Sequence, residues 1–366
     1  MKIGIYNSNT GDESVESSLV FLAESLSRRN EVEIICHGKV PLLDDFLPPA
    51  SLNRIRIRQV DEPPQLVTDP GNPALGYQRV RDWGEELTQS YDLFINYSDC
   101  CPFYNAALRG VLLVQFPQRW TLSPYRWLWH ENFKSYQLKL VSSYYARLWT
   151  KILWDVDSEV VRPSFHPRFS PGVKEKLIFC ADGPTENHCL HEAIKKLQIR
   201  LPDWNVINGQ TNYANQGLAS NLARASIYIR FQEEVAHYPP RVVPVSDLLQ
   251  VMHAGSVPLV NNVGSFPEII RHGESGFFWD TPDQLLEYAF VLTRDSARRK
   301  KMAKAAQRRA QCFGKETYVK TVLGHLQTTF GIKQHNPLNP ALVWQRIKNS
   351  TSQFLSERKV IHNTKL

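Results

Sequence analysis

The sequence predicts an α/β protein made of two doubly wound Rossmann-like domains. Strand-like and helix-like segments alternate from the first residues onward, and a second series of the same kind fills the other half of the chain. A segment rich in proline and glycine, from His166 to Gly172, separates the two series as a linker would. We therefore expect an N-terminal domain at 1–165, a second domain at 171–335 and a tail helix within 336–366.

The first series opens with a strand, a helix and a second strand. Lys2–Tyr6 is rich in β-forming residues, Ser17–Arg29 places its apolar residues at helical spacing, and Glu31–Cys36 is again strand-like. Such a βαβ unit implies a parallel sheet. The same domain is expected to contain further strands at 54–60, 91–96, 111–115, 138–142 and 159–162, and a helix that ends near 154.

The second series repeats this alternation. Sheets of this kind bind ligands outside the carboxyl ends of their strands, so two of them predict a ligand cleft between the domains. Strands are expected at 176–181, 204–207, 227–231 and 257–261, and helices at 186–197, 214–223, 247–253, 284–293, 296–312 and 317–327.

Composition narrows the class of protein. The chain has 366 residues and a formal net charge of +7, and 42% of its residues are hydrophobic, which suits folded domains rather than disorder. The six cysteines have no metal-ligand spacing, no apolar run reaches the length of a membrane span, and Lys2–Tyr6 opens directly into a strand. We therefore expect a cytoplasmic protein without a metal.

A basic run at 298–309 supplies part of the positive charge. Such a run is typical of the solvated face of a helix or of a contact with an acidic membrane surface. We favour the solvated face and keep peripheral membrane contact as the alternative. Aromatic residues do not interleave with these charges, so a nucleic-acid partner is not expected.

The segment Gly255–Trp279 carries the most specific pattern of the chain. It contains a helix end, a short buried strand, a glycine turn, a short helix with Pro267-Glu268 and a second glycine turn. This order resembles the donor-side half of GT-B glycosyltransferases of the retaining family-4 type. Other blocks that look like this family follow one another in the expected order: Lys2–Tyr6 with Leu22–Val32, Tyr91–Asn96 with Val114–Pro117, and Ser142–Trp154 with Ser158–Pro163.

The resemblance covers about residues 1–330 and implies a GT-B fold, with two domains that face each other across a cleft. It also implies a nucleotide-diphospho-sugar donor, transfer with retention and no bound cofactor. Negative charge builds up on the leaving diphosphate, so cations or N–H donors must meet it there. Members of the family typically use three devices at the donor and acceptor sites, and each of them is altered in this chain.

The first device is a glycine-rich loop after the opening strand, followed by a glutamate. In register with the family, Glu16 takes the acidic position of this acceptor-side loop, whereas Glu13 and Ser14 take the glycine positions. Gly11 is close by but out of register. Because side chains replace both glycines, the backbone is not expected to approach a ligand as closely as it does in the family.

The second device is an Arg/Lys pair in the loop after the first strand of the second domain. The corresponding loop, Cys180–His188, contains Asp182 and Glu186 and no Arg or Lys. Two acids beside a diphosphate would repel it, by about 4 kcal/mol for each pair of unit charges in contact at an effective dielectric constant of about 20. A metal ion or a more distant arginine would have to offset this repulsion.

The third device is a pair of glutamates eight residues apart that hold the sugar and the ribose. Here Val242 and Gln250 occupy these positions, and only the amide can still bind a hydroxyl. The helix that starts at Val245 and Ser246 suits an anion through its free N–H groups, although Asp247 opposes one. The donor-binding candidates are therefore Val245, Ser246 and Gln250, and no catalytic residue is assigned. Arg230, Arg241 and Arg162 are the candidate replacements for the lost basic pair.

The residues leave two hypotheses open. The first is a divergent glycosyltransferase that uses a nucleotide-diphospho-sugar, with an unknown acceptor. The second is an inactive relative that serves as a binding or structural subunit. Two segments could bind a protein partner in that case: the aromatic segment 119–130, which includes Trp120, Trp127 and Trp129, and the tail helix 341–357.

Overall fold

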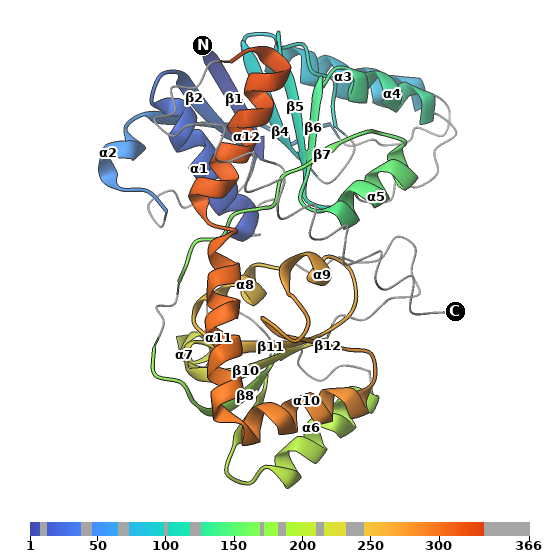
Figure 1. The fold of residues 1–366 in the computed structure, drawn as a ribbon. Coiled ribbons are helices and arrows are strands. Elements are labelled where there is room, and N and C mark those ends of the chain that lie inside the picture. The colour runs from blue at the N-terminus through green and yellow to red at the C-terminus, as the bar shows by residue number, and fades with distance from the viewer. Residues whose placement is uncertain are drawn as a thin grey trace. The chain divides into compact units, whose positions relative to one another are not determined.

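The computed structural model describes residues 1–7, 13–37, 46–64, 73–98, 102–117, 126–168, 172–181, 188–209, 216–231 and 245–332. The chain divides into a compact unit from Met1 to His325 and a second one from Leu326 to Leu366. The first unit contains two parallel sheets, as the two series of strands predict (Figure 1). In the part of the chain that is described, no helix is long and apolar enough to cross a membrane.

The first sheet has seven parallel strands in the order β3-β2-β1-β4-β5-β6-β7. The order reverses between β1 and β4, where Ile3 pairs with Leu93 on one side and with Val32 on the other. The carboxyl ends of all these strands therefore meet at one edge of the sheet. The strands are β1 (Lys2–Asn7), β2 (Glu31–Cys36), β3 (Ile55–Gln59), β4 (Leu93–Tyr97), β5 (Gly110–Val114), β6 (Leu138–Val141) and β7 (Glu159–Val160).

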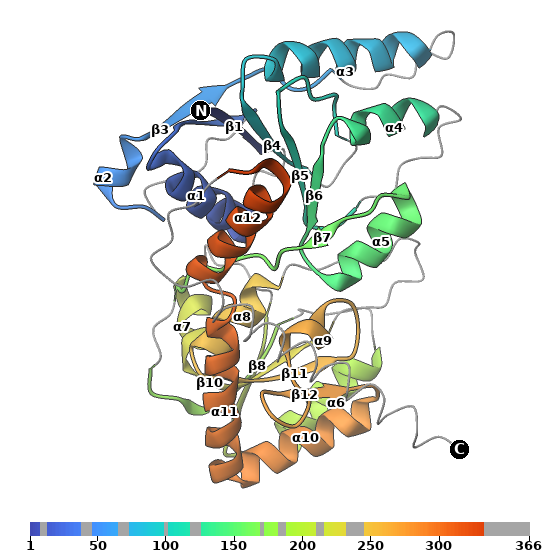
Figure 2. The same ribbon diagram turned by 45° about the horizontal axis from the view of Figure 1, so that its top comes forward.

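Helices cover the first sheet on both faces (Figure 2). Helix α1 packs on β1, β2 and β3, whereas α5 packs on β6 and β7. Buried residues of α3, α4 and α5 form clusters with side chains of the central strands, so apolar residues are needed on both faces of these strands. The helices are α1 (Glu13–Ser27), α2 (Pro49–Leu52), α3 (Pro73–Thr88), α4 (Arg126–Lys134) and α5 (Tyr144–Trp154).

The second sheet has five parallel strands in the order β12-β11-β10-β8-β9, with its reversal between β8 and β10. Its strands are β8 (Glu175–Cys180), β9 (Asn205–Asn208), β10 (Ala225–Arg230), β11 (Val257–Asn261) and β12 (Phe277–Trp279). The helices of this half are α6 (His188–Arg200), α7 (Gln216–Arg224), α8 (Ser246–His253), α9 (Phe266–Ile269), α10 (Pro282–Arg294), α11 (Ser296–Gln311) and α12 (Lys315–Phe330).

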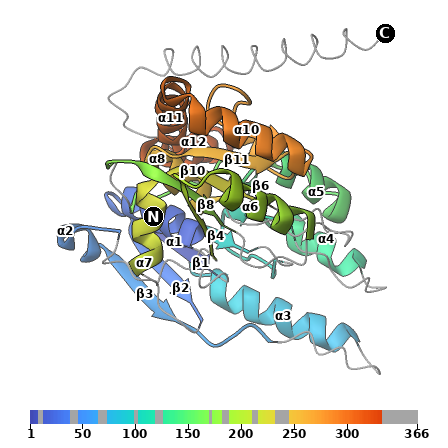
Figure 3. The same ribbon diagram turned by 90° about the horizontal axis from the view of Figure 1, so that it is seen from below.

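Alternating residues of the second sheet build two separate cores. Ile178 and Ile229 belong to the core beneath α6 and α10, which lie side by side (Figure 3). Phe179 and Tyr228 belong to the opposite core, which contains residues of α8 and α11. Because successive side chains of a strand point to opposite faces, a strand buried on both sides needs a nearly continuous apolar run. This is why β8, β10 and β11 could be predicted from the sequence.

Helix α3 is not predicted from the sequence, because Gly76 and Gly84 interrupt its helical pattern. The structure gives a reason for the second glycine. A Cβ atom at Gly84 would lie 2.5 Å from the carbonyl oxygen of Tyr104, so only glycine lets this backbone approach the helix. The short elements α2, α4 and β12 are also found in addition to the predicted ones, whereas the predicted tail helix 341–357 lies outside the described residues.

The basic run at 298–309 lies on α11. Its helix buries small and apolar residues, including Met302 and Ala306, and leaves Lys300, Lys301 and Lys304 exposed. This placement agrees with a solvated helix face. Peripheral membrane contact and the domain boundaries at 165, 171 and 335 stay predictions.

A half-buried lysine lies at the start of the second sheet. Lys174 precedes β8, and its ammonium group donates to the carbonyl oxygen of Ala223 at 2.6 Å and to Oγ of Ser256 at 3.2 Å. Burial lowers the pKa of Lys174 from 10.5 to about 8. The folded protein therefore binds this proton less tightly than the unfolded chain does, which costs stability wherever the lysine stays charged.

We expect Lys174→Met to change the dependence of stability on pH. Between about pH 8 and 10.5 the unfolded chain holds more protons at this residue, so the wild type should gain stability relative to the variant as pH rises, by about 1–3 kcal/mol in total. Urea unfolding of both proteins at pH 7 and at pH 10 measures this. The exposed neighbour Lys176 provides the control, Lys176→Met, and equal pH dependence of all three proteins would contradict the prediction.

Candidate functional site

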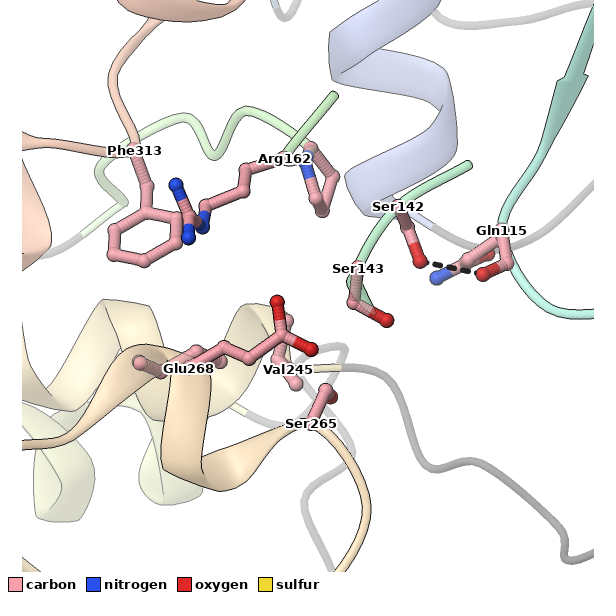
Figure 4. A pocket seen from close by; sticks show the side chains of 10 residues that line it. Gln115, Ser142, Ser143, Arg162, Val245, Ser265, Glu268 and Phe313 are labelled. Carbon is pink, nitrogen blue, oxygen red and sulfur yellow. Dashed lines mark hydrogen bonds between the residues drawn. The ribbon is translucent and has the colours of Figure 1, made fainter. Parts of the chain in front are cut away.

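A pocket of about 430 Å³, including the solvent at its mouth, lies between the two sheets. One wall comes from the carboxyl ends of β5 and β6, and the other from the starts of α8 and α9 (Figure 4). This is the edge at which parallel α/β sheets bind ligands. The lining residues are Gln115, Ser142, Ser143, Arg162, Pro163, Val245, Ser265, Glu268, Ile269 and Phe313.

Hydrogen bonds fix the wall that the first sheet provides. Oγ of Ser142 donates to the carbonyl oxygen of Gln115 at 2.5 Å, which ties the end of β6 to the end of β5. Oγ of Ser143 accepts from the amide of Ala146 at 2.9 Å and so caps α5. Both serines follow β6 directly, so strand pairing determines where their hydroxyl groups lie.

Glu268 of α9 reaches this wall from the second sheet. Its two carboxylate oxygens accept hydrogen bonds from the amides of Tyr144 and Tyr145, at 3.0 and 2.9 Å. Behind it, Arg309 donates to the carbonyl oxygens of Glu268 and Ile269, at 2.5 and 2.8 Å. Burial lowers the pKa of Arg309, with a further contribution from the nearby charge of Arg162. The carboxylate of Glu268 is therefore used in a structural contact.

Arg162 supplies an exposed cation to the pocket. Its guanidinium lies 5.9 Å from the centre of the Tyr144 ring, within the range of a cation–π contact. Among the described residues it has neither a hydrogen bond nor an ion-pair partner. Arg162 can therefore meet an anion in this pocket without giving up another ionic contact.

Arg230 lies where the second sheet reverses its order, at the end of β10, and it is buried. It forms an ion pair with Asp247 in the first turn of α8, and Asp247 also accepts a hydrogen bond of 2.6 Å from the Tyr228 hydroxyl. From the sequence, the negative charge of Asp247 is expected to repel an anion. The positive charge of Arg230 offsets this repulsion. Nε of Arg230 is buried without a partner.

Gln250 is buried and binds the linker between the two sheets. Its side-chain oxygen accepts from the amide of Arg168 at 2.9 Å, and its side-chain nitrogen donates to the carbonyl oxygen of His166. Val245 lines the pocket and precedes α8, whose first residue is Ser246, and α8 has no side-chain cap. The amide of Leu248 already donates to Oδ1 of Asp247 at 2.8 Å, so the amides of Ser246 and Asp247 are the N–H groups of the first turn that are suited to an anion. Ribose contact by Gln250 stays a prediction.

The structure describes only some of the remaining site residues that the sequence predicts. Glu16 is half-buried on α1, and His130 is half-buried on α4. The structure does not bring either of them into the pocket lining. The following predicted residues and segments lie outside the described part of the chain and stay predictions: Gly11, Arg241, Val242, the loop 182–187, the side chains of 119–129 and the tail helix 341–357.

Val245 and Arg162 are the lining residues that the sequence predicts. The others are missing from the predicted site, among them the polar residues Ser142, Ser143 and Glu268. Ser143 precedes a helical stretch, which is the signal of a cap. Glu268 stands in the block that resembles the glycosyltransferases, but its contact with α5 joins residues more than 120 positions apart. No local pattern signals such a contact.

Comparisons with solved structures identify the fold. HepE of Anabaena, solved in complex with UDP and glucose, is 14% identical with a TM-score of 0.57, and the match covers 90% of this chain and 100% of that one. Sucrose-phosphate synthase of Thermosynechococcus elongatus is 9% identical with a TM-score of 0.60, covering 91% and 100%. The chain has the GT-B fold.

A further GT-B structure, the glycosyltransferase WaaG, which is involved in lipopolysaccharide biosynthesis, is 13% identical with a TM-score of 0.55 and coverage of 90% and 100%. At these identities the likeness concerns the fold, and function has to be argued from the site. No protein-family model and no curated protein matches the sequence. In the described part of this GT-B chain, no three His, Cys, Asp or Glu residues are grouped so that they could hold a metal ion.

We expect Arg230→Met to destabilise the protein by about 3–5 kcal/mol, because it leaves the buried charge of Asp247 without its partner. The double variant Arg230→Met/Asp247→Asn should recover a large part of this loss. Urea unfolding measures both. Arg224→Ala is the control, since Arg224 pairs with Glu175 at 2.5 Å on the surface and should contribute less than about 1 kcal/mol. Similar losses for Arg230→Met and Arg224→Ala would contradict this account.

Proposed function

We propose that the chain binds a nucleotide-diphospho-sugar in the pocket between its two sheets and transfers the sugar with retention of configuration. The pocket carries this proposal: it lies at the carboxyl ends of β5 and β6 and faces the uncapped start of α8. The solved structures of HepE with UDP and with UDP-glucose support a nucleotide-sugar as the ligand class for this fold.

The diphosphate would be met by two groups of the pocket. The amides of Ser246 and Asp247, at the start of α8, would meet it with the partial positive charge of the helix end, since the third amide, that of Leu248, is bound to the Asp247 carboxylate. The guanidinium of Arg162 adds a full positive charge. Because Arg230 is paired with Asp247, Arg162 is the cation that we assign to the phosphates.

The transfer breaks the bond between the anomeric carbon and the diphosphate oxygen, and a bond to an acceptor hydroxyl forms on the same face of the sugar. The hydroxyl proton ends on the leaving diphosphate. Among the described residues that line the pocket, Glu268 is the carboxylate, and its oxygens are bonded to the amides of Tyr144 and Tyr145. The proposal therefore assigns no protein base, and the diphosphate itself takes the proton.

Specific observations favour a second candidate, a binding or structural subunit without transferase activity. Gln250 holds the linker and Arg230 neutralises Asp247, so two donor-site candidates have structural partners. Val242 replaces a carboxylate that the resembling enzymes use for the sugar. In this case a nucleotide-sugar would bind without being consumed.

We expect one of the nucleotide-sugars UDP-, GDP- or ADP-glucose to raise the stability of the protein, by about 2.7 kcal/mol at 100 times its dissociation constant. Arg162→Ala should weaken this binding at least about tenfold, because a charge-assisted contact to phosphate is lost. Thermal unfolding and calorimetric titration measure both effects. The matched control is Arg147→Ala, because Arg147 is also exposed but does not line the pocket.

Absence of any shift at millimolar nucleotide-sugar would overturn the proposal. If binding occurs, the fate of the donor separates the two candidates. Release of UDP, GDP or ADP with an acceptor supports the transferase, and nuclear magnetic resonance of the product then shows whether the anomeric configuration is retained. Binding of an intact donor with no release in the presence of acceptors supports the binding subunit.

A further inference from the structure

We propose that Glu268 is a positioning residue that holds the two walls of the pocket together by capping α5 across the two sheets. This cross-domain cap consists of the Glu268 carboxylate and the amides of Tyr144 and Tyr145. The proposal concerns the protein without ligand, so it does not depend on which nucleotide-sugar binds.

The first N–H groups of a helix have no acceptor within the helix and need one elsewhere. In α5, Oγ of Ser143 accepts from the amide of Ala146, and the carbonyl oxygen of Ser143 accepts from the amide of Arg147. The two amides before these depend on Glu268. The bond to Arg147 is the first one within the helix, so of the three capped amides at 144–146 two are held from the other half of the chain.

The chemistry of this contact is favourable. A carboxylate at the N-terminus of a helix interacts with the partial positive charge of the helix dipole, and hydrogen bonds to an ionised acceptor are stronger than neutral ones. Each oxygen of Glu268 takes one amide, so the contact is two-pronged and sets the orientation of α9 against α5. Rotation or separation of the two walls would break both bonds together.

Glu268 is itself held firmly to the second sheet. Arg309 of α11 binds the carbonyl oxygens at the end of α9, and its guanidinium lies 5.3 Å from the centre of the Phe313 ring. Gly264, with a φ of 60°, makes the left-handed turn that leads into α9. A movement of the second sheet would therefore be transmitted to Glu268 rather than absorbed by a flexible segment.

Other contacts between the two halves lie where the chain itself crosses from one to the other. Ser18 of α1 binds Ser164, which stands just before the linker, and Lys315, at the start of α12, binds Glu24 of α1 at 2.5 Å. Contacts beside a covalent crossing can persist when a cleft opens, because the crossing acts as the hinge. The cross-domain cap lies at the pocket instead, so its loss should widen the pocket.

Hydrogen exchange of the unliganded protein tests the cap directly. The amides of Tyr144 and Tyr145 have no intrahelical acceptor, so their protection reports on Glu268. We expect Glu268→Ala to speed their exchange at least about tenfold, while the amide of Ala146, held by Ser143, changes little. Small-angle scattering should show a larger radius of gyration. The control is Glu274→Ala, since Glu274 pairs with Arg271 at 3.5 Å on the surface.

Glu268→Gln keeps the shape of the side chain but leaves one acceptor oxygen, so its effect should lie between those of the wild type and Glu268→Ala. Wild-type exchange at Tyr144 and Tyr145 in Glu268→Ala would overturn the proposal. If Glu268→Ala does not fold, wild-type exchange in Glu268→Gln would overturn it equally. Faster exchange together with unchanged nucleotide-sugar affinity would confirm the cap and leave the proposed function to its own test.

Discussion

Parallel strands end at a common edge of their sheet, and this constraint places nearly every group that can act in this protein. Val114 ends β5 and Val141 ends β6. The polar residues that follow these two strands, Gln115, Ser142 and Ser143, therefore meet at the pocket, whereas the strands themselves stay apolar on both faces. Burial of the strands on both faces therefore also determines the position of the site, because polar side chains can reach a ligand only from the strand ends.

The electrostatics of the pocket differ from those suggested by single residues. Arg230 and Asp247 are opposite charges that largely cancel each other within the protein, and the carboxylate of Glu268 is met by helix amides. What remains toward the pocket is the guanidinium of Arg162 and the first amides of α8, which have no cap from the side chain of Val245. A site with these groups favours an anion.

The sequence predicts the order and type of most strands and helices, because strands buried on both faces must be continuously apolar and amphipathic helices show their period. It does not predict α3, where glycine is required by a neighbouring backbone rather than by the helix. The site is predicted less completely. Val245 was found through its place before a helix, but the pairing of Arg230 with Asp247 and of Glu268 with α5 depends on tertiary contacts, which leave no local pattern.

Gly84 is a position at which a substitution intended to stabilise the protein would have the opposite effect. Replacing a glycine inside a helix with alanine usually stabilises it, since alanine is the better helix former by about 1 kcal/mol. Here the added methyl group would meet the carbonyl oxygen of Tyr104, and Thr88, one turn further along α3, also binds the amide of Ala106 in the same segment. Glycine at position 84 therefore lowers the intrinsic helix propensity of α3 but permits close packing against 102–106. A design that considers helix propensity alone would choose alanine here and create a steric clash.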